Sequence, residues 1–348
     1  MTVSSNVTTH PEDAALGASV ARVREGILKL EGAFPLHFGG ELRDVELAWR
    51  LVGPEGAPVV VALGGISAGR YVTSDQNTKG WWAEIVGAGA PLDTTHLQIL
   101  GMDFLGGSGA TTGPTREDST FPAISAYDQA ELLARLLRHL DVPRMHAIVG
   151  ASYGGMVALC FAERFGSYVD RIVVISAADR PHPMSTAWRS VQRAIVRYAL
   201  TKNDGAEGLR LARALAMATY RSPQEFNERF AAPPTLKEGR VSFPVERYLL
   251  ARGDAYASTY RPGAFVCLSE SIDLHQVEAS KISVPTVLVA VREDQLVPIS
   301  DMRALHARMR GIAELVELSS LYGHDAFLKE TNELRSIFNR VLTAGAGK

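Results

Sequence analysis

The sequence predicts an α/β fold in which a mostly parallel sheet, flanked by helices, carries an inserted helical lid. Apolar runs of strand length alternate with amphipathic helices in the first half of the chain and again near its end, a pattern typical of a parallel sheet covered on both faces. Between these two stretches the pattern is mostly helical and is broken by prolines. We therefore assign residues 1–179 and 272–348 to one core and residues 180–271 to the lid.

The length and composition agree with this architecture. The chain has 348 residues, of which 46% are hydrophobic and 21% charged, as in an ordinary globular protein. Its net charge of −2 and the absence of a dense basic run give no support for a nucleic-acid or membrane-surface partner. No apolar stretch approaches the roughly 20 residues needed to span a bilayer.

The N-terminus and the cysteines predict a cytoplasmic protein. Residues 1–13 are polar and lack the basic-then-apolar order of a secretory signal. The two cysteines, Cys160 and Cys267, both lie in apolar runs, where cysteines behave as small hydrophobic residues. This usage indicates a reducing compartment.

The elements are expected in the following order. Residues 1–25 form a loose leader, and a hairpin turning at Gly39-Gly40 joins strands 34–38 and 45–51. Apolar runs predict the buried strands 59–63, 97–102, 146–149, 171–175, 286–291 and 313–318. Helical spacing of apolar residues predicts the core helices 127–140, 154–165, 301–309 and 330–342.

A candidate nucleophile lies between one of these strands and the helix that follows it. Residues 150–154 read Gly-Ala-Ser-Tyr-Gly, so that Ser152 occupies a Gly-x-Ser-x-Gly motif. A sharp strand-to-helix turn places such a serine at the carboxyl edge of the sheet, and the glycines avoid collisions with neighbouring backbone. The alternative is a tight turn with a serine that caps the helix. The strand and helix on either side favour the nucleophile.

Chain order then selects an acid and a histidine. Glu293 and Asp294 follow the second-to-last strand, and we favour Asp294 because it lies nearer to a turn-forming proline. Of the nine histidines, only His324 lies in a loop after the last strand; His275 and His306 lie in helical patterns and are expected at the surface. The order Ser, acid, His is that of the α/β-hydrolase fold.

Ser152, Asp294 and His324 therefore form a predicted catalytic triad. The histidine would take the serine proton, and the acid would hold the histidine and stabilise its charge. The oxyanion hole would combine the backbone N–H of Tyr153 with that of Leu63, which precedes two glycines. A simple glycine turn at this place is an equally good interpretation. The histidines show no metal-ligand spacing, so that no metal is expected.

Several motifs carry a more specific resemblance. They are an early glycine loop, a tryptophan-pair block, a glycine-rich loop, the nucleophile motif, a lid segment and the histidine motif, at residues 62–65, 79–94, 102–114, 150–156, 219–230 and 323–328. From about residue 45 to 335 the chain resembles the homoserine O-acyltransferases of the α/β-hydrolase type.

The resemblance implies a ping-pong transfer in methionine biosynthesis. Ser152 would take a succinyl or acetyl group from succinyl-CoA or acetyl-CoA, a cosubstrate and not a resident cofactor, and would pass it to homoserine. By analogy with the family, Arg221 would hold a substrate carboxylate and Asp325 the amino group of homoserine. A helix-surface arginine and a local turn are the competing interpretations. A homodimer packed through the lid is also implied, with residues 188–200 and 209–218 as candidate faces that could equally cap the active site.

The departures from the family leave other functions open. Tyr153 stands where the family commonly has methionine, and residues 65–71 lack the usual acid and histidine. Arg70 in this segment suggests a cation for a succinyl carboxylate, although it could simply face solvent. The alternatives are a serine O-acyltransferase, an esterase or thioesterase with the same triad, and a binding protein that retains the fold.

Overall fold

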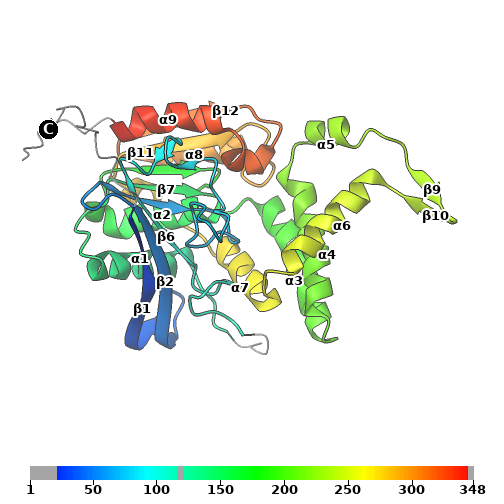
Figure 1. Ribbon diagram of the computed structural model, residues 1–348, viewed down its shortest axis with the longest axis horizontal. Coiled ribbons are helices and arrows are strands. Elements are labelled where there is room, and N and C mark those ends of the chain that lie inside the picture. Colours follow the sequence, from blue (N-terminus) through cyan, green and yellow to red (C-terminus); the bar gives the residue numbers. More distant parts are fainter. Residues whose placement is uncertain (1–21, 116–120, 344–348) are drawn as a thin grey trace, which may run out of the picture.

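The computed structural model describes residues 22–115 and 121–343, and these confirm the α/β-hydrolase fold (Figure 1). Eight strands form one sheet in the order β1-β2-β6-β3-β7-β8-β11-β12, in which β2 runs antiparallel to β1 and β6 and the other neighbours are parallel. The strands are β1 Arg22–Pro35, β2 Glu41–Gly53, β3 Val59–Leu63, β6 Gln98–Met102, β7 Ala147–Ala151, β8 Ile172–Ile175, β11 Thr286–Val291 and β12 Ala313–Leu318. A parallel pair of two-residue strands, β4 Val86–Gly87 and β5 Leu92–Asp93, lies outside this sheet.

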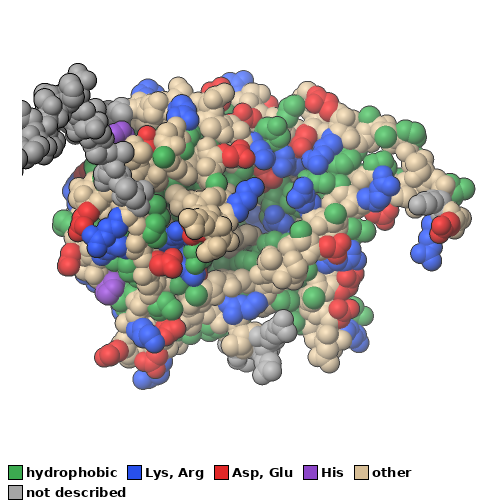
Figure 2. Space-filling view, viewed as in Figure 1, with side chains coloured by type: hydrophobic (Ala, Val, Ile, Leu, Met, Phe, Trp, Pro, Cys, Tyr) green, Lys and Arg blue, Asp and Glu red, His purple; other side chains and the backbone are tan. Residues whose placement is uncertain are grey.

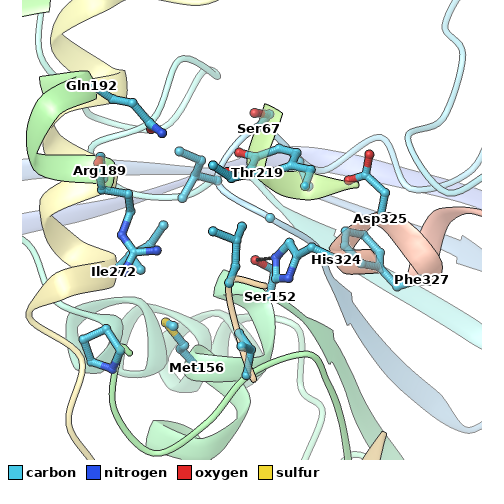
Figure 3. Close-up of a pocket in the computed structure, with 18 of the residues that line it drawn as sticks. Ser67, Ser152, Met156, Arg189, Gln192, Thr219, Ile272, His324, Asp325 and Phe327 are labelled. Atoms are coloured by element: carbon cyan, nitrogen blue, oxygen red, sulfur yellow. Dashed lines mark hydrogen bonds between the residues drawn. The ribbon is translucent and has the colours of Figure 1, made fainter. Parts of the chain in front are cut away.

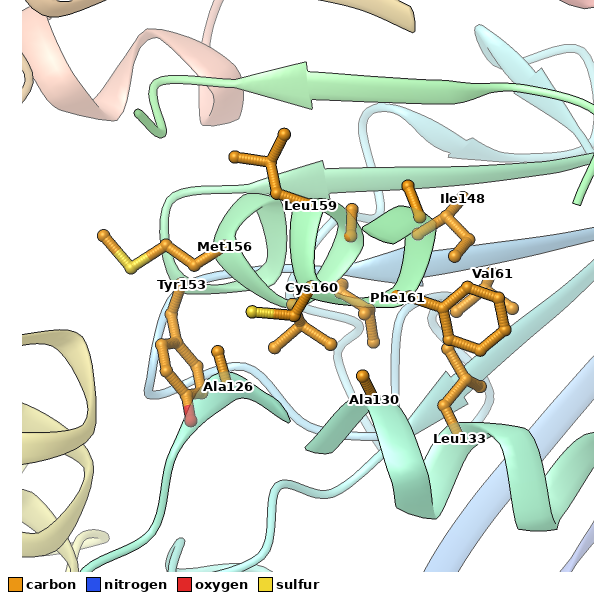
Figure 4. Close-up of a cluster of buried hydrophobic side chains, with 14 of the residues drawn as sticks. Val61, Ala126, Ala130, Leu133, Ile148, Tyr153, Met156, Leu159, Cys160 and Phe161 are labelled. Carbon is orange, nitrogen blue, oxygen red and sulfur yellow. The ribbon is translucent and has the colours of Figure 1, made fainter. Parts of the chain in front are cut away.

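Helices cover both faces of the sheet. The core helices are α1 Ala126–His139, α2 Tyr153–Phe165, α8 Ile299–Arg308 and α9 Thr331–Thr343. Because successive strand residues point to opposite faces, Val61 and Ile148 pack in one apolar cluster with α1, α2 and α8, whereas Val60 and Val149 pack in another with α9. Figure 4 shows the first cluster, in which Phe161 of α2 lies between the sheet and α1. The central strands are therefore buried on both sides.

The lid is inserted between β8 and β11 and projects away from the sheet (Figure 1). Its helices are α3 Pro183–Leu200, α4 Gly205–Tyr220, α5 Pro223–Arg229, α6 Pro244–Ala257 and α7 Pro262–Asp273. α4 packs against both α3 and α6, and α7 returns to the core, where Leu268 joins the main apolar cluster. The C-terminal end of α4 contacts the segment that carries His324.

Two sequence expectations are wrong in detail. Residues 22–25 were expected in a leader but begin β1, a long edge strand paired with β2; residues 1–21 lie outside the described part of the chain. The lid, expected to be mostly helical, also contains an antiparallel hairpin of β9 Thr235–Lys237 and β10 Arg240–Ser242. Both segments are polar and largely exposed, so they lack the apolar runs from which strands were predicted.

No helix within residues 22–115 and 121–343 is long and apolar enough to cross a membrane.

Candidate active site

Ser152 lies in a strained turn between β7 and α2. Its φ is 54° and its ψ −121°, a region that a residue with a side chain rarely occupies. The flanking glycines are required by close backbone contacts, since a Cβ on Gly150 would lie 2.2 Å from the carbonyl oxygen of Gly154, and one on Gly154 would lie 2.3 Å from that of Leu63. The Ser152 side chain makes no helix-capping hydrogen bond. It is instead directed toward His324.

The structure brings Ser152, His324 and Asp294 into one hydrogen-bonded chain (Figure 3). The Ser152 hydroxyl donates to Nε2 of His324 at 2.8 Å, and Nδ1–H of His324 donates to Oδ2 of Asp294 at 2.7 Å. Oδ1 of Asp294 accepts from the backbone N–H groups of Leu296 and Val297. This arrangement fixes the tautomer in which Nε2 can accept the serine proton.

Glu293, the other acid that the sequence allowed, has a different role. Its carboxylate accepts hydrogen bonds from Ser319 Oγ at 2.5 Å and from the backbone N–H of Ser320 at 2.7 Å. It therefore holds the loop that leads to His324 and does not contact the imidazole.

The surroundings of His324 favour its charged form more than burial opposes it. Burial alone would lower the pKa of His324, but the charge and hydrogen bond of Asp294, together with the charge of Asp325, raise the pKa above its ordinary value of 6.5. The charge of Arg189 acts in the opposite direction. A histidine in this setting can hold a proton while a neighbouring bond rearranges.

The predicted oxyanion residues flank Ser152. Tyr153 is the first residue of α2, and its N–H belongs to the helix turn whose N–H groups lack an intrahelical acceptor. Leu63 ends β3, and Gly64 after it accepts a hydrogen bond from the N–H of Gly154. The oxyanion role of Leu63 and Tyr153 stays a prediction.

The Tyr153 side chain points away from the cavity and into the protein. Its hydroxyl bonds Ser271 Oγ of α7 at 2.6 Å and accepts from Nε2 of Gln129 of α1 at 3.3 Å. Figure 4 shows this ring beside the core cluster. Burial raises the pKa of the Tyr153 hydroxyl well above its usual range. The tyrosine thus connects the serine turn to the lid.

A cavity of about 210 Å³ opens over Ser152 and His324 and is lined by both core and lid. The core supplies Trp81 and Asp325, among others, and α4 supplies Thr219 and Tyr220. The Tyr220 ring lies 5.9 Å from the His324 ring, centroid to centroid. The lid therefore covers the active-site cavity.

The pair Trp81 and Trp82 positions the side of the cavity that carries His324. The rings of Trp81 and Trp82 stack with centroids 4.9 Å apart. Nε1–H of the buried Trp82 donates to the carbonyl of Phe327 at 2.8 Å, and Nε1–H of Trp81 donates to the carbonyl of Gly69 at 3.0 Å. Trp82 thus fixes the short 3-10 helix Gly323–Leu328 that carries His324.

The structure brings only one of the three predicted substrate residues to the cavity. Asp325 lines it. Arg221, expected there, does not line it and forms ion pairs with Asp325 at 3.0 Å and Glu225 at 3.2 Å. Arg70 also lies outside the lining, because its guanidinium pairs with the buried Asp103.

Arg213 of α4 lines the cavity and was missed from the sequence. Its guanidinium lies over the rings of Tyr256 and Tyr220, at 4.6 and 5.1 Å from their centroids, and Nη1 donates to the Tyr220 hydroxyl at 3.3 Å. It forms no ion pair with a carboxylate in the described part of the chain. The signal was an arginine on α4 whose neighbours one turn further along the helix, Ala216 and Met217, are small or apolar and buried.

His275, expected at the surface, is instead buried. Its Nε2–H donates to the carbonyl of Ala178 at 3.0 Å, and its Nδ1 lies 3.7 Å from Cys160 Sγ. Burial lowers the pKa of His275 to about 4, so that it stays neutral. His306 is part-buried, with Nε2 bonded to the carbonyl of Ala313. Within the described residues, no group of His, Cys, Asp or Glu side chains could hold a metal ion.

Comparison with known proteins agrees with this geometry. Residues 58–331 match the family described as alpha/beta hydrolase fold. The chain is 42% identical over 310 residues to a homoserine O-succinyltransferase of Xanthomonas campestris pv. campestris, covering 88% of this chain and 81% of the relative. It is 31% identical to a homoserine O-acetyltransferase of Mycolicibacterium smegmatis, covering 89% and 91%.

Solved structures share the fold. A homoserine O-acetyltransferase of Staphylococcus aureus superimposes with a TM-score of 0.80 at 22% identity, over 94% of this chain and 97% of that one. Esterase E22 superimposes with a TM-score of 0.82 at 18% identity, over 92% and 100%. At this identity the likeness bears on the fold alone.

Proposed function

The chain belongs to the homoserine O-acyltransferases of the α/β-hydrolase fold, and we propose that it transfers a succinyl group from succinyl-CoA to the hydroxyl of homoserine. The observation that carries the proposal is the identity of 42% over most of the chain to a homoserine O-succinyltransferase, against 31%, 30% and 31% to three homoserine O-acetyltransferases. The hydrogen-bonded Ser152, His324 and Asp294 support it, because they provide the nucleophile and base that acyl transfer needs.

The first half of the reaction would acylate Ser152. Its Oγ attacks the thioester carbonyl while its proton passes to Nε2 of His324, and Asp294 stabilises the imidazolium. The N–H groups of Tyr153 and Leu63 are proposed to bind the developing oxyanion. The C–S bond then breaks, His324 returns the proton to the departing sulfur, and coenzyme A leaves a succinyl ester on Ser152.

The second half would pass the acyl group to homoserine. Arg213 carries a guanidinium without a carboxylate partner in the described chain, and Asp325 carries a carboxylate in the same cavity. They suit the carboxylate and the ammonium of an amino acid. The homoserine hydroxyl loses its proton to His324 and attacks the ester, and Ser152 regains a proton when its C–O bond breaks.

The surface around the cavity supports a coenzyme A thioester as donor. Figure 2 shows Lys and Arg side chains gathered around the hollow between the core and the lid. Coenzyme A carries phosphates, which arginines bind through charge-assisted hydrogen bonds. We propose succinyl-CoA as a cosubstrate, with no resident metal or organic cofactor.

The quaternary state and compartment are part of the same proposal. Met184, Val191 and Tyr198 follow one another at intervals of seven along α3 and are more than half exposed. An exposed apolar stripe at this spacing suits a helix of a second copy, and we propose a homodimer through the lid. The buried free thiols of Cys160 and Cys267 agree with a cytoplasmic protein.

A single assay tests the proposal. Purified protein is given succinyl-CoA or acetyl-CoA with homoserine, serine or no acceptor, and released coenzyme A and O-acyl product are quantified. We expect homoserine-dependent release that is fastest with succinyl-CoA, and a loss of roughly 10³-fold or more in Ser152→Ala. Acceptor-independent release would show a hydrolase, and faster turnover with serine would show a serine O-acyltransferase.

A further inference from the structure

A second polar region of the cavity lies on α3, away from Asp325. Arg189 and Gln192 both line the cavity and lie three residues apart on this helix, so that they share one face. In Figure 3 they lie on one side of the Ser152–His324 pair and Asp325 lies on the other. The cavity therefore has two polar ends with the nucleophile between them.

Arg189 is held rigidly at its end. Nε and Nη2 of Arg189 donate to Oδ1 of Asp273 at 2.8 and 2.6 Å, and Thr186 Oγ1 donates to the same oxygen at 2.8 Å. Burial would raise the pKa of Asp273, but its bonds with the two arginines Arg189 and Arg193 lower that pKa below the ordinary value. Asp273 thus stays ionised and fixes the guanidinium plane.

The cluster carries more positive than negative charge. Arg193 donates from Nη1 to Oδ2 of Asp273 at 2.5 Å and to Ser269, so that two arginines share one carboxylate. Nη1 of Arg189 makes no hydrogen bond with any described residue. It is also not fully enclosed by protein, so it is open to the cavity. One donor and about one unit of positive charge are therefore left for a ligand.

Gln192 adds a second unpaired group. It is 4% exposed, yet its amide makes no hydrogen bond with the described residues. The amide is not among the fully enclosed unpaired atoms of the described residues, so it is open to the cavity, and Figure 3 shows it directed there. An amide N–H beside a guanidinium N–H is a suitable pair of donors for one carboxylate.

The donor pair shares one cavity with the reacting atoms. Arg189 and Gln192 line the same cavity as Ser152 and His324, which are hydrogen-bonded to each other. Arg213 and Asp325 would bind homoserine at the other end of the cavity. An acyl group attached to Ser152 can then extend toward α3 without competing with the amino acid.

We propose that Arg189 and Gln192 bind the distal carboxylate of the succinyl group and set the preference for succinyl-CoA over acetyl-CoA. This inference rests on the proposed acyl transfer and adds the residues that select the donor. An acetyl group has no distal carboxylate, so it gains nothing from the two donors. Arg70, the cation first considered for this role, is paired with Asp103 instead.

The test measures the donor half-reaction alone. Protein is mixed with succinyl-CoA or acetyl-CoA without acceptor, and the acyl adduct on Ser152 is followed by rapid-quench intact mass spectrometry. In Gln192→Glu, which leaves the Arg189–Asp273 pair in place, we expect the ratio of the second-order acylation rates, succinyl over acetyl, to fall by about tenfold or more. Arg189→Ala should lower the same ratio.

A matched control is available on the same helix. Arg197 also joins α3 to α7, through an ion pair with Glu270, but lies outside this cavity. Arg197→Ala should therefore leave the ratio unchanged. If Gln192→Glu leaves this ratio unchanged, whether the two rates stay the same or fall equally, the proposed subsite is overturned.

Homoserine added after acylation separates this failure from that of the proposed function. Wild-type protein that acylates but does not pass the group to homoserine would overturn the function and not the donor subsite. Wild-type protein that forms no adduct with either donor would overturn both.

Discussion

At the residue scale, the backbone strain at Ser152 is maintained by contacts that admit no substitute. A Cβ at Gly150 or Gly154 would overlap backbone atoms of the turn or of β3. Strained positions of this kind persist only when the surrounding structure determines them. The serine hydroxyl is thereby directed at His324, 2.8 Å away, before any substrate binds.

The raised pKa of His324 predicts the acid side of the pH profile. His324 must be neutral to accept the serine proton, and its pKa is raised above 6.5 by Asp294 and Asp325, which outweigh burial. The rate of Ser152 acylation should therefore fall as the pH drops through a value above 6.5, by about tenfold per pH unit. Measuring the rate of Ser152 acylation over a series of pH values locates this acid limb of the profile.

The variant Asp325→Asn tests whether the charge of Asp325 raises the pKa of His324. Removing one of the charges that raise the pKa of His324 should move the acid limb to lower pH. A limb that stays in place, or one that lies below 6.5 in the wild-type protein, would contradict the account.

Chain order and local context were sufficient to select Ser152, Asp294 and His324, because each follows a strand at the same edge of the sheet. They were not sufficient for the arginines. Arg70 was chosen by its position in the sequence and Arg221 by analogy with the family, but buried or partly buried carboxylates from other segments pair with them. Arg213 could be assigned only when α4 was placed over His324.

At the element scale, α3 and α7 are joined by two kinds of ion pair. The pair of Arg193 with Asp273 is buried, whereas the pair of Arg197 with Glu270 is largely exposed. Buried charged hydrogen bonds stabilise a protein more than exposed ones, since exposed pairs are screened by water and salt.

Matched substitutions on α3 should show the difference. Arg193→Met leaves Ser269 without a charged donor and Asp273 with Arg189 as its one remaining arginine partner, and we expect the free energy of unfolding to fall by about 2 kcal/mol. Arg197→Met should change it by less than about 1 kcal/mol. Urea denaturation followed by circular dichroism measures both, and equal losses would contradict the assignment.

The elements themselves were predictable where burial is two-sided. Strands such as β7 and β11 appear as unbroken apolar runs because both faces are covered. Residues 22–25 at the start of β1 and the lid hairpin β9–β10 are exposed and polar, so their pairing depends on neighbours that the sequence does not reveal. His275 was misplaced for a similar reason, because its burial depends on contacts with Ala178 and Cys160.

At the scale of the whole molecule, helix α3 of the lid has two faces that differ in character. The inner face of α3 carries Arg189 and Gln192 toward the cavity, and its outer face carries the exposed stripe of Met184, Val191 and Tyr198. A dimer through the outer face would brace the helix that positions the inner residues.

The dimer can be measured directly. Size-exclusion chromatography with light scattering should give twice the mass of one chain, and Val191→Asp, at the middle of the stripe, should shift it toward one chain because a charge cannot be buried there without a partner. Val23→Asp on the exposed edge strand β1 is the control and should not change the mass. A wild-type mass of one chain would refute the proposal.

The two thiols described above have a practical consequence for the assays. Cys160 is a fully enclosed residue of α2, and burial raises the pKa of its thiol. Cys267 of α7 lies at the junction of lid and core, where burial raises the pKa of its thiol to about 12. Neither forms the reactive thiolate readily. Disulfide reagents that detect free coenzyme A should therefore be consumed slowly by the native protein. Cys267, which lines a second pocket beside the lid, should react before the fully buried Cys160.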